Sequence, residues 1–272
     1  MSLKRHLQKA RKDKKAIGQF NFSTLDQLQA ILSSSVSLNI PVIVGTSVKE
    51  ATFFGMAEAA TLVGYYQKKG AKIYLNLDHG RDIETVKKAI DVGYNMVHFD
   101  GSKMDFEANI KDTKRVVSYA HKKGILVEGE VGYVPGQSAM NKCDLPDVDV
   151  VAIEDVVCFV KNTNVDLIAL PFGSVHGIYS QAPKIKFKFL KDVSRIKPFL
   201  VLHGGSGVKD DDIKKAIKLG ITKINVNTEL RMAWRDGLKQ SLKSSEYAPY
   251  SLLNKSRSNV ESRVKEKLLI FW

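Results

Sequence analysis

Residues 199–229 read FLVLHGGSGVKDDDIKKAIKLGITKINVNTE. The apolar runs at 199–207 and 223–229 predict two strands, and the apolar residues of 210–219 recur with the 3.6-residue period of a helix. Gly220 stands where this helix ends and can adopt the left-handed conformation of a C-terminal cap. Because strands joined through a helix pair in parallel, the stretch predicts one β/α/β unit.

The same unit recurs along the chain. Eight strand-like runs alternate with helical patterns, at 17–22, 41–47, 72–78, 95–101, 125–132, 166–173, 199–207 and 223–229. Eight nearly continuous apolar strands predict an α/β protein with a single (β/α)8 TIM barrel over residues 1–272, a usual length for this fold. A doubly wound open sheet is the alternative, but no GxGxxG fingerprint follows the first strand. We expect the long connection at 133–152 to be an active-site lid loop.

The chain carries 42 Lys and Arg against 29 Asp and Glu, a formal net charge of +13. The excess lies at the two ends, because 1–15 holds seven basic residues and one acidic, and 231–272 holds nine and four. The body has no basic stripe with interleaved aromatics and no zinc-finger, RNP or KH signature, so we expect no nucleic-acid partner. Weak steering of phosphorylated substrates is one hypothesis for the basic ends.

Cysteine usage and apolar run lengths predict a cytoplasmic protein. Cys143 and Cys158 are the only cysteines, and neither forms a CxxC pair. The apolar runs fall short of the roughly 20 residues of a membrane span, so no membrane partner is expected. The basic N-terminal stretch lacks the apolar core of a secretory signal.

Three histidines, His79, His176 and His203, each follow an apolar strand and precede a glycine. The carboxyl ends of barrel strands converge on one face, so these side chains are expected to meet there. Three imidazoles from different strands form a catalytic zinc site with an open fourth position. The other histidines receive different roles, with packing expected for His98 and solvent exposure for His6 and His121.

Carboxylates follow several of the same strands. Asp78 directly precedes His79, so we expect a general acid/base beside a metal-bound substrate, with the orientation of a histidine as the alternative. Asp100 and Glu130 would bind a second cation, or would be ordinary polar residues at the barrel rim.

Two glycine- and hydroxyl-bearing turns, HGGSG (203–207) and NVNT (225–228), follow the last two predicted strands. Barrels commonly bind phosphate at this position. Glycine lets backbone N–H groups approach an anion closely, and Ser or Thr hydroxyls add donors. Together the two turns predict a phosphate site.

These residues together resemble the zinc-dependent class II fructose-bisphosphate/tagatose-bisphosphate aldolase family. The matching segments run in collinear order over nearly the whole chain: FNFSTLDQLQAIL (20–32), PVIVGTS (41–47), LNLDHG (75–80), HFDGSKMDFEANI (98–110), VEGEVG (127–132), FGSVHGIY (172–179), LHGGSGV (202–208) and KINVNTELR (223–231). The resemblance implies a lyase that reversibly cleaves a ketose 1,6-bisphosphate, fructose 1,6-bisphosphate first, to dihydroxyacetone phosphate and glyceraldehyde 3-phosphate. It also implies a homodimer or homotetramer.

The resemblance implies a role for each matched residue. His79, His176 and His203 would bind the catalytic Zn2+, which would stabilise an enediolate as a Lewis acid. Asp78 would exchange a proton with the aldehyde-derived oxygen. Asp100 and Glu130 match positions linked to a second cation, divalent or monovalent. The substrate and its phosphates would be held by Ser47, Gly177, Gly204, Gly205, Ser206, Asn225, Val226, Asn227 and Thr228.

The sequence departs from the family pattern in the lid and in the predicted strand that ends at Asp78. Asn76 stands where the family has His, two residues before its catalytic Asp. PGQSAM (135–140) replaces a GGQED-like lid, so Ser138 and Ala139 stand at acidic positions and the base for proton abstraction is unassigned. Asp144 or Asp147, further along the same loop, is a candidate for that base.

Two alternatives to a fructose-bisphosphate aldolase stay open, and a third is disfavoured. The chain could be a tagatose-bisphosphate aldolase, or a weakened zinc- and sugar-phosphate-binding protein on the same scaffold. A Schiff-base aldolase would need a lysine at a strand end, whereas Lys223 begins its predicted strand.

Overall fold

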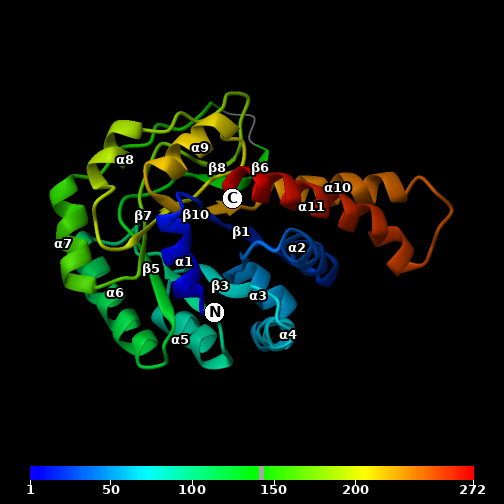
Figure 1. The fold of residues 1–272 in the computed structure, drawn as a ribbon, viewed down its shortest axis with the longest axis horizontal. Coiled ribbons are helices and arrows are strands. Elements are labelled where there is room, and N and C mark those ends of the chain that lie inside the picture. The colour runs from blue at the N-terminus through cyan, green and yellow to red at the C-terminus, as the bar shows by residue number, and fades with distance from the viewer. Residues whose placement is uncertain (141–143) are drawn as a thin grey trace.

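The computed structural model describes residues 1–140 and 144–272, and in it eight parallel strands close into a barrel (Figure 1). Around the barrel the strands follow the order β1-β10-β9-β7-β5-β4-β3-β2. Their bounds are β1 Ile17–Asn21, β2 Val42–Ser47, β3 Ile73–Gly80, β4 Met96–Phe99, β5 Leu126–Glu130, β7 Leu167–Ala169, β9 Phe199–Leu202 and β10 Ile221–Val226. All eight overlap the expected runs, so the predicted (β/α)8 barrel is confirmed.

Helices surround the barrel (Figure 1). They are α1 Leu3–Lys12, α2 Leu25–Leu38, α3 Val48–Phe54, α4 Met56–Lys68, α5 Ile83–Val92, α6 Phe106–His121, α7 Ile153–Thr163, α8 Phe187–Val193, α9 Asp210–Lys218, α10 Thr228–Ser241 and α11 Pro249–Phe271. Gly220 follows α9 with a φ of 123°, a conformation that strains any residue with a side chain. Helices α10 and α11 form a hairpin that projects from the barrel (Figure 1).

Helix α1 covers the amino end of the barrel. Leu3, Leu7 and Ala10 of this helix pack in one apolar cluster with residues from inside the barrel, such as Ile17 and Val201. The prediction that His6 is solvated is wrong, because the same helix face buries His6, whose Nδ1 lies 2.8 Å from the hydroxyl of Tyr74. A helix whose one face seals a barrel buries every residue of that face, polar or not.

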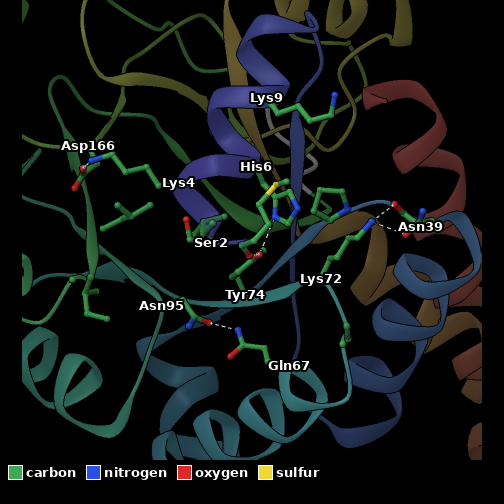
Figure 2. A pocket seen from close by; sticks show the side chains of 18 of the residues that line it. Ser2, Lys4, His6, Lys9, Asn39, Gln67, Lys72, Tyr74, Asn95 and Asp166 are labelled. Carbon is green, nitrogen blue, oxygen red and sulfur yellow. Dashed lines mark hydrogen bonds and ion pairs between the residues drawn. The ribbon is translucent and has the colours of Figure 1, made fainter.

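A cavity of about 900 Å³ lies beside α1 at this amino end (Figure 2). Its polar side chains already have partners within the chain: His6 contacts Tyr74, Lys4 pairs with Asp166, Lys72 with Asn39, and Gln67 with Asn95. His121, exposed as expected, also borders this cavity and pairs with Asp166. The predicted site residues lie at the opposite, carboxyl end of the barrel.

The segment 133–152 differs from the expected loop. Its residues Gly136–Met140 form β6, which pairs in parallel with β8, His176–Ile178, outside the barrel. Three positions of this segment, 141–143, including Cys143, lie outside the described residues. Pairing with β8 places Gly136 directly opposite His176, one of the three predicted metal ligands.

Among the helices of the described residues, none combines the length and the apolar character that a membrane span requires.

Candidate active site

The end of β3 is irregular where it carries Asp78 and His79. Pairing with β4 changes register between Leu77 and Gly80, and His79 has a φ of 54°, in the left-handed region. The backbone N–H of His79 donates to Nδ1 of His98 over 3.2 Å. Side chains of a regular strand alternate in direction, whereas this irregular end presents Asp78 and His79 to the same cavity. The strained backbone conformation therefore lies at His79, a predicted metal ligand next to the predicted acid/base Asp78.

The three predicted metal ligands converge at this end of the barrel. The ring centroid of His79 lies 5.1 Å from that of His176 and 4.8 Å from that of His203, and the last two are 5.8 Å apart. They come from β3, from β8 and from the residue that follows β9. Closure of the barrel brings together residues that are up to 124 positions apart in the sequence.

One nitrogen of each imidazole is oriented by an oxygen acceptor. The pairs are His79 Nδ1 with Asp100 Oδ2 at 2.9 Å, His176 Nδ1 with the Val134 carbonyl at 3.3 Å, and His203 Nε2 with Glu128 Oε1 at 2.7 Å. An acceptor of this kind keeps the proton on the nitrogen that it contacts. In the neutral form of each ring, the lone pairs are therefore left on Nε2 of His79, Nε2 of His176 and Nδ1 of His203.

Two of these lone pairs face each other, because Nε2 of His79 lies 3.1 Å from Nδ1 of His203. Such an arrangement is repulsive unless a proton or a metal ion lies between the nitrogens. The spacing is close to the roughly 3.3 Å between ligands that a tetrahedral site with zinc–nitrogen bonds of about 2.0–2.1 Å requires. The residues therefore fit an imidazole-bound divalent metal.

The charges around the imidazoles also attract a cation. Burial disfavours protonated His79, but Asp78, Asp100 and Glu130 outweigh it and raise its pKa to about 9. Burial, together with His79 and His203, lowers the pKa of His176 to about 4, so its ring is neutral at pH 7. A neutral imidazole is the form that binds a metal, and a metal at His79 would displace a proton.

Asp78 is buried and held by two side-chain amides. Its Oδ2 accepts a hydrogen bond from Nδ2 of Asn21 at 2.9 Å, and its Oδ1 accepts one from Nδ2 of Asn225 at 3.1 Å. Burial alone would raise the pKa of Asp78, but electrostatic interactions with His79, His203 and Lys223 lower it. The carboxylate is therefore ionised and fixed in orientation at neutral pH.

His98 has a larger part in this site than packing within its strand. It is fully buried, and its Nε2 lies 3.2 Å from Oε2 of Glu130. Asp78, His79, His98 and His203 form one group whose potential ligand atoms all lie within 4.8 Å of one another. A second such group consists of His79, Asp100 and Glu130, the residues expected near a second cation. The sequence signal for His98 was weak, because His98 is not followed by glycine at a strand end.

A cavity of about 150 Å³ opens beside Asp78 and the imidazoles. Ten predicted site residues line it: Ser47, Asp78, His79, His176, Gly177, Gly204, Ser206, Asn225, Asn227 and Thr228. Thr228 begins α10, so the positive end of that helix faces the cavity next to the hydroxyl of Ser206. The Ser47 hydroxyl accepts the backbone N–H of Glu50 as the N-cap of α3, which leaves its own hydrogen free to donate.

Other predicted residues lie near the cavity without lining it. His203 is fully buried behind its wall, and Asp100 and Glu130 line an adjoining cavity of about 180 Å³. Gly205 donates its N–H to the carbonyl of Asn225 at 2.9 Å, and Val226 packs in the apolar core. The last two support the turns, and their roles as phosphate ligands stay predictions.

The sequence reasoning missed three residues at this site: Asn21, Glu50 and Arg231. Asn21 and Arg231 line the cavity, and Glu50, only 5% exposed, accepts from both, at 3.0 Å and 2.6 Å. Arg231 follows Thr228 by three residues on α10, so its helical spacing gave a usable signal. Glu50 had a local signal as well, because Ser47 and Glu50 form the capping box of α3, and the backbone N–H of Ser47 donates to Oε2 of Glu50 at 2.8 Å. That signal predicts a helix start and not the contacts of Glu50 with β1 and α10.

The described lid residues bring no carboxylate to the cavity. Ser138 lines it, and its carbonyl accepts a hydrogen bond from Nη1 of Arg231 at 3.1 Å. Asp144 and Asp147, the suggested replacement bases, are both exposed and do not line it. Asp78 is the one carboxylate among the described residues that line this cavity.

Comparison with known proteins identifies the family of this chain. The family model described as fructose-bisphosphate aldolase class-II matches residues 1–272. The 6-phospho-5-dehydro-2-deoxy-D-gluconate aldolase of Shouchella clausii is 39% identical over 96% of this chain and 91% of its own. The sulfofructosephosphate aldolase of Alkalicoccus urumqiensis and the fructose-bisphosphate aldolase of Staphylococcus aureus are each 36% identical, over the whole of this chain and 96% of their own.

A solved structure of an aldolase has the same fold. The YdjI aldolase of Escherichia coli K12 superposes with a TM-score of 0.88 at 30% sequence identity, covering 99% of this chain and 96% of its own. With a family model that spans all 272 residues and relatives that are 36–39% identical over nearly the whole chain, the chain belongs to the class II fructose-bisphosphate aldolase family.

Proposed function

We propose that this protein is a zinc-dependent aldolase that reversibly cleaves a ketose 1,6-bisphosphate, with fructose 1,6-bisphosphate as the first candidate substrate. The products would be dihydroxyacetone phosphate and glyceraldehyde 3-phosphate. The observation that carries the proposal is the pair of facing nitrogens of His79 and His203, 3.1 Å apart beside the ionised Asp78.

His79, His176 and His203 would hold the zinc ion, each through the nitrogen that its acceptor leaves unprotonated. The metal supplies Lewis-acid stabilisation of the negative charge that develops on the substrate's carbonyl oxygen. Glu128 and Asp100 fix the rings of His203 and His79, so the ligands would need little rearrangement on binding. Asp100 and Glu130, together with His79, are our proposal for a second cation site.

Asp78 would move the proton of the cleavage step. In the cleavage direction, its carboxylate takes the proton from the substrate hydroxyl as the carbon–oxygen bond becomes double and the carbon–carbon bond breaks. In condensation, the same proton returns to the aldehyde oxygen. Asn21 and Asn225 donate to both carboxylate oxygens, so they hold Asp78 in orientation throughout.

The phosphate of the dihydroxyacetone half would bind at Gly177, Gly204, Ser206 and the start of α10. These residues offer neutral donors and a helix N-terminus, and they share one cavity with Asp78. Ser47 would approach the second phosphate from the other side of the cavity. The segment 133–152 would act as the lid, since Ser138 lines the cavity.

A coupled cleavage assay tests the proposal directly. Fructose and tagatose bisphosphates, sulfofructose phosphate and the phosphodehydrodeoxygluconate named for the relatives are offered with zinc, with chelator, and with chelator followed by zinc. We expect cleavage of a ketose bisphosphate that chelator abolishes and zinc restores. Cleavage of sulfofructose phosphate or of the phosphodehydrodeoxygluconate alone would overturn the proposal of a ketose bisphosphate as substrate. Full activity after metal removal would overturn the metal-dependent mechanism.

A second candidate is a zinc- and sugar-phosphate-binding protein with weak catalysis. The absence of a carboxylate from the described lid residues in the cavity favours it. Metal and phosphate binding without carbon–carbon cleavage of any of the four substrates would support it. A Schiff-base route finds no support at Lys223, which lies in the middle of β10 and whose Nζ is bound to Glu128 and Asn225 inside the barrel.

A further inference from the structure

A carboxylate lies directly behind the proposed phosphate-binding turn. Oε1 of Glu229 accepts the N–H of Gly207 at 3.0 Å, and the backbone N–H of Glu229 donates to the Ser206 hydroxyl at 3.4 Å. Because the Ser206 oxygen already accepts this bond, its own hydrogen is free to donate to an anion in the cavity. Glu229 thus fixes the turn from behind and orients the donor that the turn offers.

The same carboxylate is an electrostatic problem for an anion site. Glu229 is 11% exposed in its side chain, so water screens its charge poorly. A negative charge held next to a phosphate-binding turn repels the dianion that the turn would bind. A nearby cation would cancel the negative charge of Glu229 and would leave its hydrogen bonds to the turn in place.

Lys267 of α11 provides that cation. Its side chain is only 7% exposed, and its Nζ lies 3.3 Å from Oε2 of Glu229 and 3.6 Å from Oδ1 of Asp210. Asp210 begins α9, directly after the turn that contains Ser206, and Glu229 lies in the first turn of α10. One buried ammonium therefore contacts both chain segments that leave the phosphate site. Arg263, more exposed, adds a weaker contact at 3.7 Å from Glu229.

We infer that Lys267 is a positioning residue for phosphate binding: it holds the starts of α9 and α10 together and neutralises Glu229 behind the turn at Ser206 and Gly207. Lys267 touches no substrate. It acts through Glu229, from a helix that is near the end of the chain and lines no part of the cavity. The inference rests on the proposed phosphate site.

The test measures binding of inorganic phosphate to the zinc-loaded protein by titration calorimetry, with KM and kcat for the cleaved substrate as a second readout. Lys267→Met should weaken phosphate binding about tenfold and raise KM more than it lowers kcat. Lys265→Met, which removes an exposed partner of Glu261 on the same helix, is the matched control and should leave both unchanged.

The double variant Glu229→Gln/Lys267→Met separates electrostatics from packing. The side-chain amide oxygen that Glu229→Gln introduces still accepts the Gly207 N–H but carries no charge, so phosphate affinity should return toward that of the unmodified protein. Affinity that stays as low as in Lys267→Met would overturn the neutralising role. If Lys267→Met does not fold, Glu229→Gln alone is the test. It leaves the positive charge of Lys267 unbalanced next to the turn, so it should bind phosphate more tightly than the unmodified protein. An unchanged or weaker phosphate affinity would refute the inference.

Two outcomes distinguish failure of the phosphate site from failure of the role of Lys267. If the unmodified protein binds no phosphate, the proposed phosphate site and the role of Lys267 both fall. If it binds phosphate and Lys267→Met binds it equally well, the role of Lys267 alone is wrong.

Discussion

Nζ of Lys223 lies 2.8 Å from Oε2 of Glu128, in the interior of the barrel where both side chains are fully buried. The other oxygen of Glu128 accepts from His203 at 2.7 Å. One carboxylate therefore joins a structural ion pair to a proposed metal ligand. Stability and metal binding should respond differently when the two partners are changed.

Glu128→Gln should weaken zinc binding by about 10- to 100-fold, because His203 loses the carboxylate that fixes its ring. It should also lower the free energy of unfolding by about 3–5 kcal/mol, since the buried charge of Lys223 loses its ion-pair partner and keeps only the neutral side chain of Asn225. The double variant Glu128→Gln/Lys223→Met should recover most of the stability and none of the zinc affinity. Chemical denaturation and metal titration measure the two effects, and parallel recovery of both would contradict the assignment.

Asp78→Asn should lower kcat by roughly 10²- to 10⁴-fold, the usual contribution of a general acid/base. Phosphate affinity and zinc content should change little, because the phosphate donors and the imidazoles remain. Steady-state kinetics with metal analysis of the same sample checks this. A variant that keeps near-normal kcat would remove Asp78 from the proton transfer.

Ser138→Glu should speed exchange of a carbon-bound proton of dihydroxyacetone phosphate by about tenfold or more, because it returns a carboxylate to the lid strand at the cavity. Deuterium exchange followed by NMR measures this step without the aldehyde. Met140→Glu, at an exposed position of the same strand, is the control. Equal exchange in the Ser138 variant and the unmodified protein would mean that the lid acid is not what limits proton abstraction.

His6 should make the fold less stable as the pH falls. Burial lowers the pKa of His6 below its ordinary value of 6.5, so the unfolded chain binds a proton more readily than the folded protein. Its contribution is therefore complete above about pH 6.5 and is lost as the pH falls below that value. Comparing Tm at pH 7.5 and pH 5.5, His6→Asn should show a smaller loss than the unmodified protein. A loss of equal size would exclude His6 as the cause.

The alternation of apolar runs and helical patterns was sufficient to predict the barrel and its eight strands. The period of apolar residues is a local property, and strands linked by helices have few ways to pair. The same logic placed His79 and His203 at one face, because barrel closure brings the strand ends there. His176 joins them from β8, which pairs with β6 outside the barrel. Ten of the predicted site residues line one cavity.

Other features depended on contacts that no local pattern encodes. His6 is buried because α1 seals the barrel, and Glu50 receives Asn21 and Arg231 from β1 and α10, elements distant in sequence. Residues 136–140 became a strand only because β8 offered an edge for pairing. The sequence by itself determined which chemical groups reach the carboxyl face. Tertiary structure decided which nitrogen of each histidine is available and how Lys267 balances Glu229, because tautomers and charge balance depend on neighbours brought together by folding.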